Sequence, residues 1–201
     1  MPSQVRDAYD ALASIYTDFV RGKLEEDPLD RALLGLFAEL VQGPVVELGC
    51  GPGRMAAHLH SLGVDAFGID LSPRLIEIAR QAHPQMRFKV GDMAALDLAD
   101  ASVSGVLSWY SIIHTLPQQL PGILAEMHRI LTPGGHLLLG FFEGPELEPF
   151  DHKVVLAYRW PIDLLAELSR QAGFTELARL IRQPNPGQRF PGGTLLLRKT
   201  T

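Results

Sequence analysis

Residues 45–54 have the sequence Val45-Val46-Glu47-Leu48-Gly49-Cys50-Gly51-Pro52-Gly53-Arg54. The first four residues form a short, largely apolar run, which is typical of a strand buried on both faces. The glycines that follow are spaced by two, so the backbone can turn tightly and a ligand can lie against bare main chain. A glycine-rich turn alone is equally compatible with a purely structural turn. The stretch therefore predicts a buried strand followed by a candidate ligand loop.

Apolar runs and helical patterns alternate along the rest of the chain. We expect strands at residues 45–48, 64–70, 86–90, 103–109, 136–142, 174–182 and 194–198. We expect helices at residues 3–20, 28–40, 54–62, 73–83, 120–131 and 161–172. Apolar strands that alternate with helices indicate a mostly parallel sheet covered on both faces. The last two strands have no helix between them, so we expect them to pair as an antiparallel ribbon.

Two local details refine these elements. Asp27 and Pro28 suit the cap and first turn of a helix. The apolar stripe of this helix is expected to consist of Leu29, Leu33, Leu36, Phe37 and Leu40. The run Thr132-Pro133-Gly134-Gly135 predicts a sharp turn ahead of the strand at 136–142.

Composition and charge narrow the class of protein. The chain has 201 residues, 46% of them hydrophobic, which suggests one globular domain. Its formal net charge of −5 argues against a nucleic-acid partner, because phosphate backbones favour basic surfaces. The single cysteine excludes a disulfide framework and a multi-cysteine zinc site. We expect a cytoplasmic protein without a membrane partner, because we find neither a long apolar run nor a signal-peptide pattern.

Open α/β sheets bind ligands at the carboxyl ends of their strands, so the residues at those points are informative. Asp70 ends the second strand, where a carboxylate can accept hydrogen bonds from a ribose diol. Ser72 already suits the cap of the next helix, which favours a ligand role for Asp70. Gly91, Asp92 and Met93 follow the third strand, where an acid can bind an exocyclic amine and a methionine can lie against a purine. Asp92 is equally compatible with capping its own short turn.

The glycine spacing bears on the kind of nucleotide. A dinucleotide-binding fingerprint needs its third glycine three places after the second, and that position holds Arg54. The three strand ends together offer contacts for a methionine tail, a ribose and an adenine along one edge of the sheet.

With these features the sequence resembles the class I S-adenosylmethionine-dependent methyltransferases that act on small molecules. The resemblance is carried by the loop at 47–53, Asp70, residues 91–93, the turn at 131–135 and the segment Tyr9-Asp10-x-x-Ala13-x-x-Tyr16, which is similar to their lid helix. It covers about residues 9–199. It implies an open three-layer α/β/α sandwich with a Rossmann-like, mostly parallel seven-stranded sheet, an antiparallel last strand and N-terminal lid helices.

The resemblance also implies cofactor contacts. The implied set is Glu47, Gly49, Cys50, Gly51, Gly53, Asp70, Leu71, Gly91, Asp92, Met93, Ser108, Trp109 and Tyr16. The glycine loop with Glu47 would cradle the methionine moiety, Asp70 would hold the ribose, and Asp92 with Met93 the adenine. Ser108 and Trp109 would line the methyl-donating face. We expect Cys50 to pack rather than to act as a nucleophile, because no base accompanies it in the sequence.

The acceptor side is less sharply defined. His114 is the candidate general base, although a histidine there is also compatible with tying down its loop. Tyr110, His114, His152 and Tyr158 are candidate acceptor contacts, whereas Trp160 is more compatible with packing. No cluster of histidines and carboxylates at ligand spacing is visible, so no metal is expected.

The predicted organisation is a single methyltransferase domain over residues 1–201. It comprises lid helices at 1–43, a cofactor-binding core at 44–142, an acceptor-side insertion without periodic pattern at 143–160, and the last helix with the strand pair at 161–201. The short insertion favours a small-molecule acceptor. Two alternatives stay open: a nicotinamide-dependent oxidoreductase on a related sheet, and an S-adenosylmethionine-binding module without catalysis or dependent on a partner. The acceptor, the atom methylated and the oligomeric state stay open as well.

Overall fold

The structure, a computed structural model, describes residues 2–185 and 187–200. Met1 and Thr201, at the ends of the predicted domain, and Pro186, in the predicted C-terminal loop, lie outside the described residues. The elements follow in the order α1 (Pro2–Val20), α2 (Lys23–Glu26), α3 (Pro28–Leu40), β1 (Val45–Leu48), α4 (Arg54–Ser61), β2 (Ala66–Asp70), α5 (Pro73–Ala82), β3 (Arg87–Val90), β4 (Val103–Trp109), η1 (Ile112–His114), η2 (Pro117–Gln119), α6 (Leu120–Ile130), β5 (Leu131–Phe142), β6 (Glu148–Phe150), β7 (Ala157–Arg159), α7 (Ile162–Gln171), β8 (Phe174–Arg182) and β9 (Gly192–Lys199). Within the described part of the chain, no helix combines the length and apolarity needed to cross a membrane.

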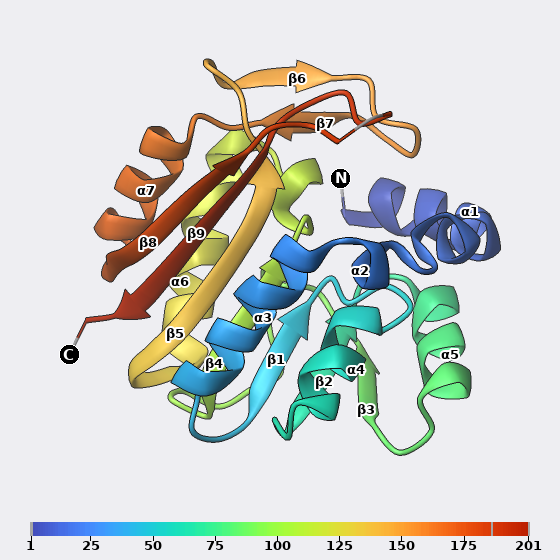
Figure 1. Ribbon diagram of the computed structural model, residues 1–201, viewed down its shortest axis with the longest axis horizontal. Helices are drawn as coiled ribbons and strands as arrows, with labels where there is room; N and C mark the ends of the chain where they lie inside the picture. Colours follow the sequence, from blue (N-terminus) through green and yellow to red (C-terminus); the bar gives the residue numbers. More distant parts are fainter. Residues whose placement is uncertain (1, 186, 201) are drawn as a thin grey trace.

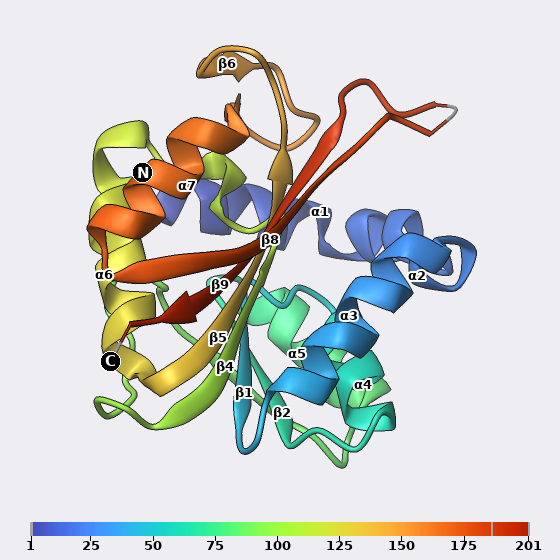
Figure 2. The ribbon, with the colours of Figure 1, turned by 60° about the vertical axis from the view of Figure 1, so that its left-hand side comes forward.

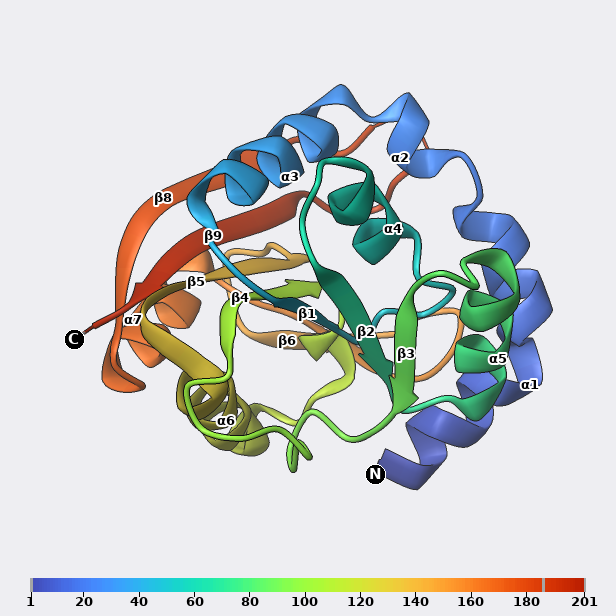
Figure 3. The same ribbon diagram turned by 90° about the horizontal axis from the view of Figure 1, so that it is seen from below.

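Seven strands form one sheet in the order β3-β2-β1-β4-β5-β9-β8, seen from below in Figure 3. The strands from β3 to β5 pair in parallel. Strand β9 is antiparallel to both of its neighbours, β5 and β8. The predicted mostly parallel seven-stranded sheet with an antiparallel last strand is therefore confirmed. The winding reverses between β1 and β4, which is where a ligand crevice is expected in such a sheet.

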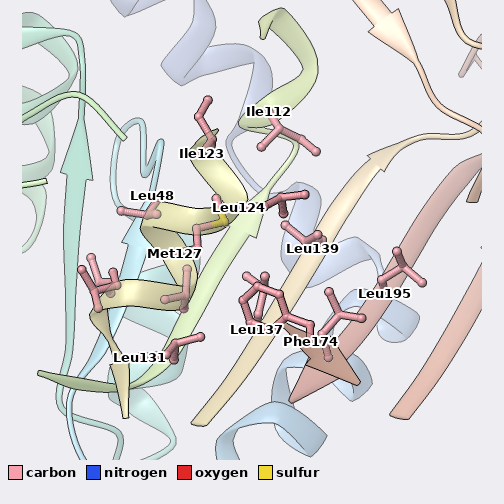
Figure 4. Close-up of a cluster of buried hydrophobic side chains, with 14 of the residues drawn as sticks. Leu48, Ile112, Ile123, Leu124, Met127, Leu131, Leu137, Leu139, Phe174 and Leu195 are labelled. Atoms are coloured by element: carbon pink, nitrogen blue, oxygen red, sulfur yellow. The ribbon is translucent and has the colours of Figure 1, made fainter. Parts of the chain in front are cut away.

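Helices cover both faces of this sheet, as the nearly edge-on view in Figure 2 shows. On one face α3, α4 and α5 share an apolar core with the strands. On the other face α6 and α7 build a second core, in which Leu124 and Met127 of α6 pack with Leu137 and Leu139 of β5 (Figure 4). Helix α1 lies outside the three layers, beside α5 (Figure 1). The three layers are complete without α1, so this helix is free to cover the carboxyl ends of the strands.

The apolar stripe of α3 differs from the prediction. Leu34 and Phe37 are fully buried, whereas Leu29 and Leu36 are among the exposed large hydrophobic residues. Leu33 and Leu40, the other predicted stripe residues, are half-buried and pack against the same core. The prediction therefore fails only in including Leu29 and Leu36, which lie on the solvent side of the helix, and in omitting Leu34. The predicted cap is correct, because the Asp27 side chain accepts hydrogen bonds from the backbone N–H groups of Leu29 and Asp30.

Two loops also differ from the prediction. The expected turn at 132–135 is a bulge inside β5, because Leu131 already pairs with Val103 and the register shifts before His136 pairs with Gly105. The insertion at 143–160, which has no periodic pattern, contains the antiparallel pair β6–β7. These strands have three residues each, too few for a periodicity to be recognised in the sequence.

Candidate active site

The loop after β1 has the conformation that its glycines predict. Gly49, Gly51 and Gly53 have φ values of +71°, +53° and +84°, in the left-handed region that favours glycine. A Cβ atom on Gly49 would lie 2.3 Å from Cβ of Ser111, and one on Gly53 would lie 2.7 Å from the ring of Phe88. Gly49 and Gly53 are therefore required by packing as well as by φ.

Asp70 ties this loop to the end of β2. Its Oδ2 accepts a hydrogen bond of 2.7 Å from the backbone N–H of Gly51, and its Oδ1 one of 2.8 Å from that of Ser72. Burial raises the pKa of Asp70, and these amide hydrogen bonds act in the opposite direction. Two carboxylate oxygens have about four lone-pair sites, so acceptor capacity remains on the cavity side, which Asp70 lines.

The end of β3 contributes Gly91, Asp92 and Met93 to the same wall. Oδ1 of Asp92 accepts a hydrogen bond of 2.9 Å from the backbone N–H of Ala94, as the turn-capping interpretation requires. Among the described residues, no hydrogen bond to Oδ2 of Asp92 is found. Asp92 can therefore cap its turn and still offer one oxygen to a ligand.

The chain turns sharply after β4. Tyr110 has φ of +55°, which is uncommon for a residue with a side chain, and its N–H donates to the carbonyl of Gly140 at 2.8 Å. The turn brings Ser111 against Gly49, and Oγ of Ser111 lies 2.7 Å from Oγ of Ser108. Sequence reasoning missed this contact of Ser111, because nothing in the sequence marks a serine for contact with a loop some sixty positions away.

Helix α1 covers the glycine loop. The ring of Tyr16 lies next to Gly51, 3.4 Å from where a Cβ atom would stand. Oδ1 of Asp10 accepts hydrogen bonds from Oγ of Ser72 at 2.5 Å and from the N–H of Arg74 at 3.1 Å, so α1 is fastened to the first turn of α5. The spacing of Tyr9, Asp10 and Tyr16 in the lid-like motif carried the signal for these contacts.

A second connection joins the lid to the η1 turn. The hydroxyl oxygen of Tyr9 lies 2.9 Å from Nε2 of His114, and Nδ1 of His114 lies 2.9 Å from the carbonyl oxygen of Leu156 in the insertion. Burial is the largest influence on the His114 pKa and lowers it to about 4. The imidazole is therefore neutral near pH 7 and joins three segments that are distant in the sequence.

These elements enclose a cavity of about 380 Å³ at the carboxyl ends of β1 to β4. The predicted site residues that line it are Gly49, Gly51, Asp70, Leu71, Gly91, Asp92, Met93, Trp109, Tyr110, His114 and Tyr16. It is also lined by residues outside the predicted cofactor and acceptor sets, among them Arg6, Tyr9, Thr115, Gln118 and Gln119, and by Ser111 after β4.

The structure places three predicted loop residues behind the cavity wall. Oε2 of Glu47 accepts a hydrogen bond of 2.8 Å from the N–H of Ala56, and burial raises the pKa of Glu47 to about 8. Cys50 is buried against Gly68, where a Cβ atom would lie 2.6 Å from its sulfur. Its pKa is raised by burial, which agrees with the packing interpretation and with no nucleophilic role. Gly53 packs on Phe88, so these three residues shape the loop from behind.

Three further predicted residues also lie outside the cavity lining. Ser108 is fully buried in β4, and its hydroxyl oxygen is hydrogen-bonded to that of Ser111. The ring of His152 contacts that of His114, with ring centres 5.0 Å apart. Tyr158 packs against the core beneath α6 and α7. Trp160 is fully buried in that core, as the packing interpretation requires. Within residues 2–185 and 187–200, no three metal-ligating side chains gather into a candidate metal site.

Comparison with known proteins agrees with this architecture. Residues 45–135 match the model of the methyltransferase domain family. The malonyl-[acyl-carrier protein] O-methyltransferase of Erwinia billingiae is 30% identical over 159 residues, which cover 79% of this chain. The chain spans 58% of the length of that relative.

Two solved structures share the fold over nearly the whole chain. The 1,6-didemethyltoxoflavin-N1-methyltransferase of Burkholderia thailandensis, solved with 1,6-didemethyltoxoflavin and S-adenosylhomocysteine bound, has a TM-score of 0.70 at 24% identity and covers 96% of this chain and 90% of its own. A putative methyltransferase in complex with the Trm112 activator of Haloferax volcanii has a TM-score of 0.74 at 22% identity and covers 98% of both chains. At these identities the likeness concerns the fold. The chain is thus similar to class I S-adenosylmethionine-dependent methyltransferases, in the domain match at residues 45–135 and in the relative, and it shares the fold of the solved methyltransferase structures.

Proposed function

We propose that this protein transfers the methyl group of S-adenosylmethionine to a small organic acceptor. The observation that carries the proposal is the cavity at the strand ends, with bare main chain at Gly49 and Gly51 beside the carboxylate of Asp70. Bare main chain admits an extended ligand closely, and a carboxylate at that point can accept hydrogen bonds from a ribose diol. Asp92 and Met93 suit an adenine. The residues present therefore fit an adenosyl ligand.

The chain's own contribution would be alignment and exclusion of water. When bound, S-adenosylmethionine supplies a methyl group that is already activated for displacement. The residues then have to hold the acceptor in line and close to it, which can supply much of the rate enhancement. Tyr16 covers the loop, and Trp109 and Ser111 line the adjacent wall. The modest volume of the cavity supports a small acceptor, methylated at O, N, C or S.

Calorimetry tests the cofactor assignment. We expect both S-adenosylmethionine and S-adenosylhomocysteine to bind with roughly micromolar Kd values, the range usual for such ligands. A panel of small hydroxyl, amine and thiol compounds, with mass-spectrometric detection of the methylated product, then tests turnover. Failure of both ligands to bind would remove the proposal.

A nicotinamide-dependent oxidoreductase is the first alternative. It would use the same strand ends, but Arg54 occupies the place of the third fingerprint glycine. Trp109 lines the cavity, so bound NADH would quench its fluorescence and emit by energy transfer. Energy transfer to NADH without binding of S-adenosylmethionine would favour the oxidoreductase.

A binding module without catalysis, or a subunit that needs a partner, is the second alternative. The Haloferax volcanii complex pairs a putative methyltransferase with an activator, which gives this alternative a specific precedent. It predicts cofactor binding without turnover by the isolated chain. Turnover by the isolated chain on any member of the panel would exclude it.

The remaining expectations from the sequence stay predictions. These are the division of residues 1–201 into lid, core, insertion and C-terminal segments, the cytoplasmic location, and the absence of nucleic-acid, membrane and metal partners. His114, Tyr110, His152 and Tyr158 stay candidate acceptor-side residues. Of these, Tyr110 and His114 have the better support, because they line the cavity.

A further inference from the structure

Tyr9 and His114 form a hydrogen-bonded pair whose proton positions are fixed by their partners. The carbonyl oxygen of Leu156 can only accept, so Nδ1 of His114 carries the hydrogen of that 2.9 Å contact. In a neutral imidazole Nε2 is then the acceptor, and the hydroxyl of Tyr9 must donate to it across 2.9 Å. The pair is thus ordered in one direction, from the hydroxyl to Nε2.

This order changes the role available to His114. Its only lone pair is engaged by Tyr9, so His114 cannot take a proton directly from a molecule in the cavity. The oxygen of Tyr9, in contrast, still has its own acceptor capacity, and Tyr9 lines the cavity. A proton can therefore reach His114 only through the Tyr9 hydroxyl.

We propose that the methyl acceptor is an uncharged hydroxyl compound that donates its hydrogen to the oxygen of Tyr9, with Tyr9 passing its own hydrogen to Nε2 of His114. This inference rests on the proposed methyl transfer and names the acceptor class and the path of the proton. Tyr9 is the group that touches the acceptor, and His114 acts through it.

The step balances in atoms and charge. The acceptor oxygen forms a bond to the methyl carbon, and the electron pair of the broken carbon–sulfur bond stays on sulfur. The acceptor proton moves to Tyr9, the Tyr9 proton moves to His114, and an imidazolium results, which loses its proton to solvent after the lid opens. A hydroxyl becomes strongly acidic as its oxygen is methylated, so even the weakly basic imidazole suffices during the transfer.

The lining of the cavity supports an uncharged acceptor. Arg6 is the one cationic side chain among the described lining residues, and it is paired with Asp7 at 2.9 Å. The anionic lining residues are Asp70 and Asp92, and both are proposed to bind the adenosyl ligand. The lining residues that follow His114 in the chain include Thr115, Gln118 and Gln119, which are polar but uncharged. A carboxylate or a thiolate would find no unpaired cation there among the described residues.

Nitrogen-15 NMR of the histidine side chains tests the pair in the free protein. We expect His114 as the Nδ1–H tautomer with a hydrogen bond accepted at Nε2. In Tyr9→Phe, which removes only the hydroxyl, the Nε2 resonance should move to the position of a nitrogen without that bond. An Nε2–H tautomer, or a resonance unchanged in Tyr9→Phe, would overturn the inference. Loss of S-adenosylmethionine binding would instead count against the proposed function, so the two failures are distinguishable.

The variants Tyr9→Phe and His114→Gln distinguish a role of the pair in proton transfer from a purely structural role. The side chain of His114→Gln can still accept from Tyr9 and donate to Leu156, but it cannot hold a proton. With the hydroxyl compound of the panel that turns over fastest, we expect Tyr9→Phe and His114→Gln each to lower kcat about 100-fold or more, with little change in cofactor Kd. The control His60→Gln, at an exposed position of α4, should keep kcat. Retained kcat in His114→Gln, or turnover confined to amines or thiols of the panel, would contradict the relay.

Discussion

At the scale of single residues, the glycine loop combines two separate constraints. A left-handed backbone costs a residue with a side chain about 1 to 2 kcal/mol, whatever surrounds it. Gly49 carries a second constraint, because its missing side chain leaves room for Ser111. Gly22, with φ of +74° and no heavy atom within 4 Å of where a Cβ atom would stand, carries the first constraint alone.

Alanine substitutions at these two glycines separate the constraints. We expect Gly22→Ala to lower the free energy of unfolding by about 1 to 2 kcal/mol, and Gly49→Ala to lower it by clearly more because of the clash. The double variant Gly49→Ala/Ser111→Gly should recover the excess. Urea denaturation measures all three. Equal effects of the two single variants would show that contact with Ser111 does not restrict the loop.

Asp70 provides the direct test of the cofactor site. In Asp70→Asn one oxygen and the negative charge are lost, so we expect cofactor binding to weaken by about 1.5 to 3 kcal/mol, the usual value of hydrogen bonds to a charged acceptor. Calorimetry with S-adenosylhomocysteine measures the change. Asp65→Asn is the matched control, because Asp65 precedes the opposite end of β2 and pairs with Arg87 on the surface. Unchanged affinity in Asp70→Asn would mean that the ribose binds elsewhere.

At the scale of elements, a mostly buried ion cluster holds α3 against β8. Arg182 at the end of β8 donates to Asp27 and Asp30 at the start of α3, and the side chains in these pairs are only 13 to 15% exposed. Removing one partner leaves charges without compensation in a poorly solvated place. The cluster therefore connects the start of α3 with the end of β8, and nothing in the sequence predicts this contact.

We expect Arg182→Met to lower the free energy of unfolding by about 3 kcal/mol, because two carboxylates lose their shared cation. Arg170→Met is the control, since the ion pair of Arg170 with Glu167 is exposed on α7 and should contribute little. Thermal and urea denaturation of both variants give the comparison. If Arg182→Met lost as little free energy of unfolding as Arg170→Met, solvent would have to compensate the charges of Asp27 and Asp30.

The elements also show how far the sequence could predict the structure. The strands that build the site were predictable, because strands buried on both faces are nearly continuous apolar runs. Val45–Leu48 and Val103–Trp109 are examples. The pair β6–β7 was not predictable, because its strands have only three residues each and are paired through tertiary contacts, among them the ion pair of Arg159 with Glu148. In the site, residues at strand ends were found from topology. The contact of Tyr9 with His114 and the packing of Ser111 on Gly49 were missed, because they depend on tertiary structure.

At the scale of the whole molecule, one buried acid should couple folding to pH. Burial raises the pKa of Glu47 to about 8, whereas a glutamate in an unfolded chain has a pKa of about 4.3. Between these values the folded protein binds more protons than the unfolded chain at this site. The contribution of Glu47 to the free energy of unfolding therefore falls as the pH rises from about 4.3 to about 8.

Glu47→Gln keeps an acceptor for the N–H of Ala56 and removes the titration. We expect the variant to gain stability relative to the parent between about pH 5 and pH 8, and the difference to level off above that. Urea denaturation across this range measures it, and Glu39→Gln, at an exposed position of α3, should track the parent. Parallel pH profiles of the parent and Glu47→Gln would contradict a raised pKa.

The place of β9 in the sheet has a consequence for biosynthesis. Strand β9 follows β5 and β8 in the chain but lies between them, and it supplies all the ladder pairing of β8. While the ribosome is still translating the final codons of β9, β8 has no neighbour and the edge of β5 is open. Domains commonly begin to fold during synthesis, and unpaired strand edges favour aggregation. A nascent chain stalled before Gly192 should therefore depend on chaperones, and release of the complete strand would close the sheet in a single late event.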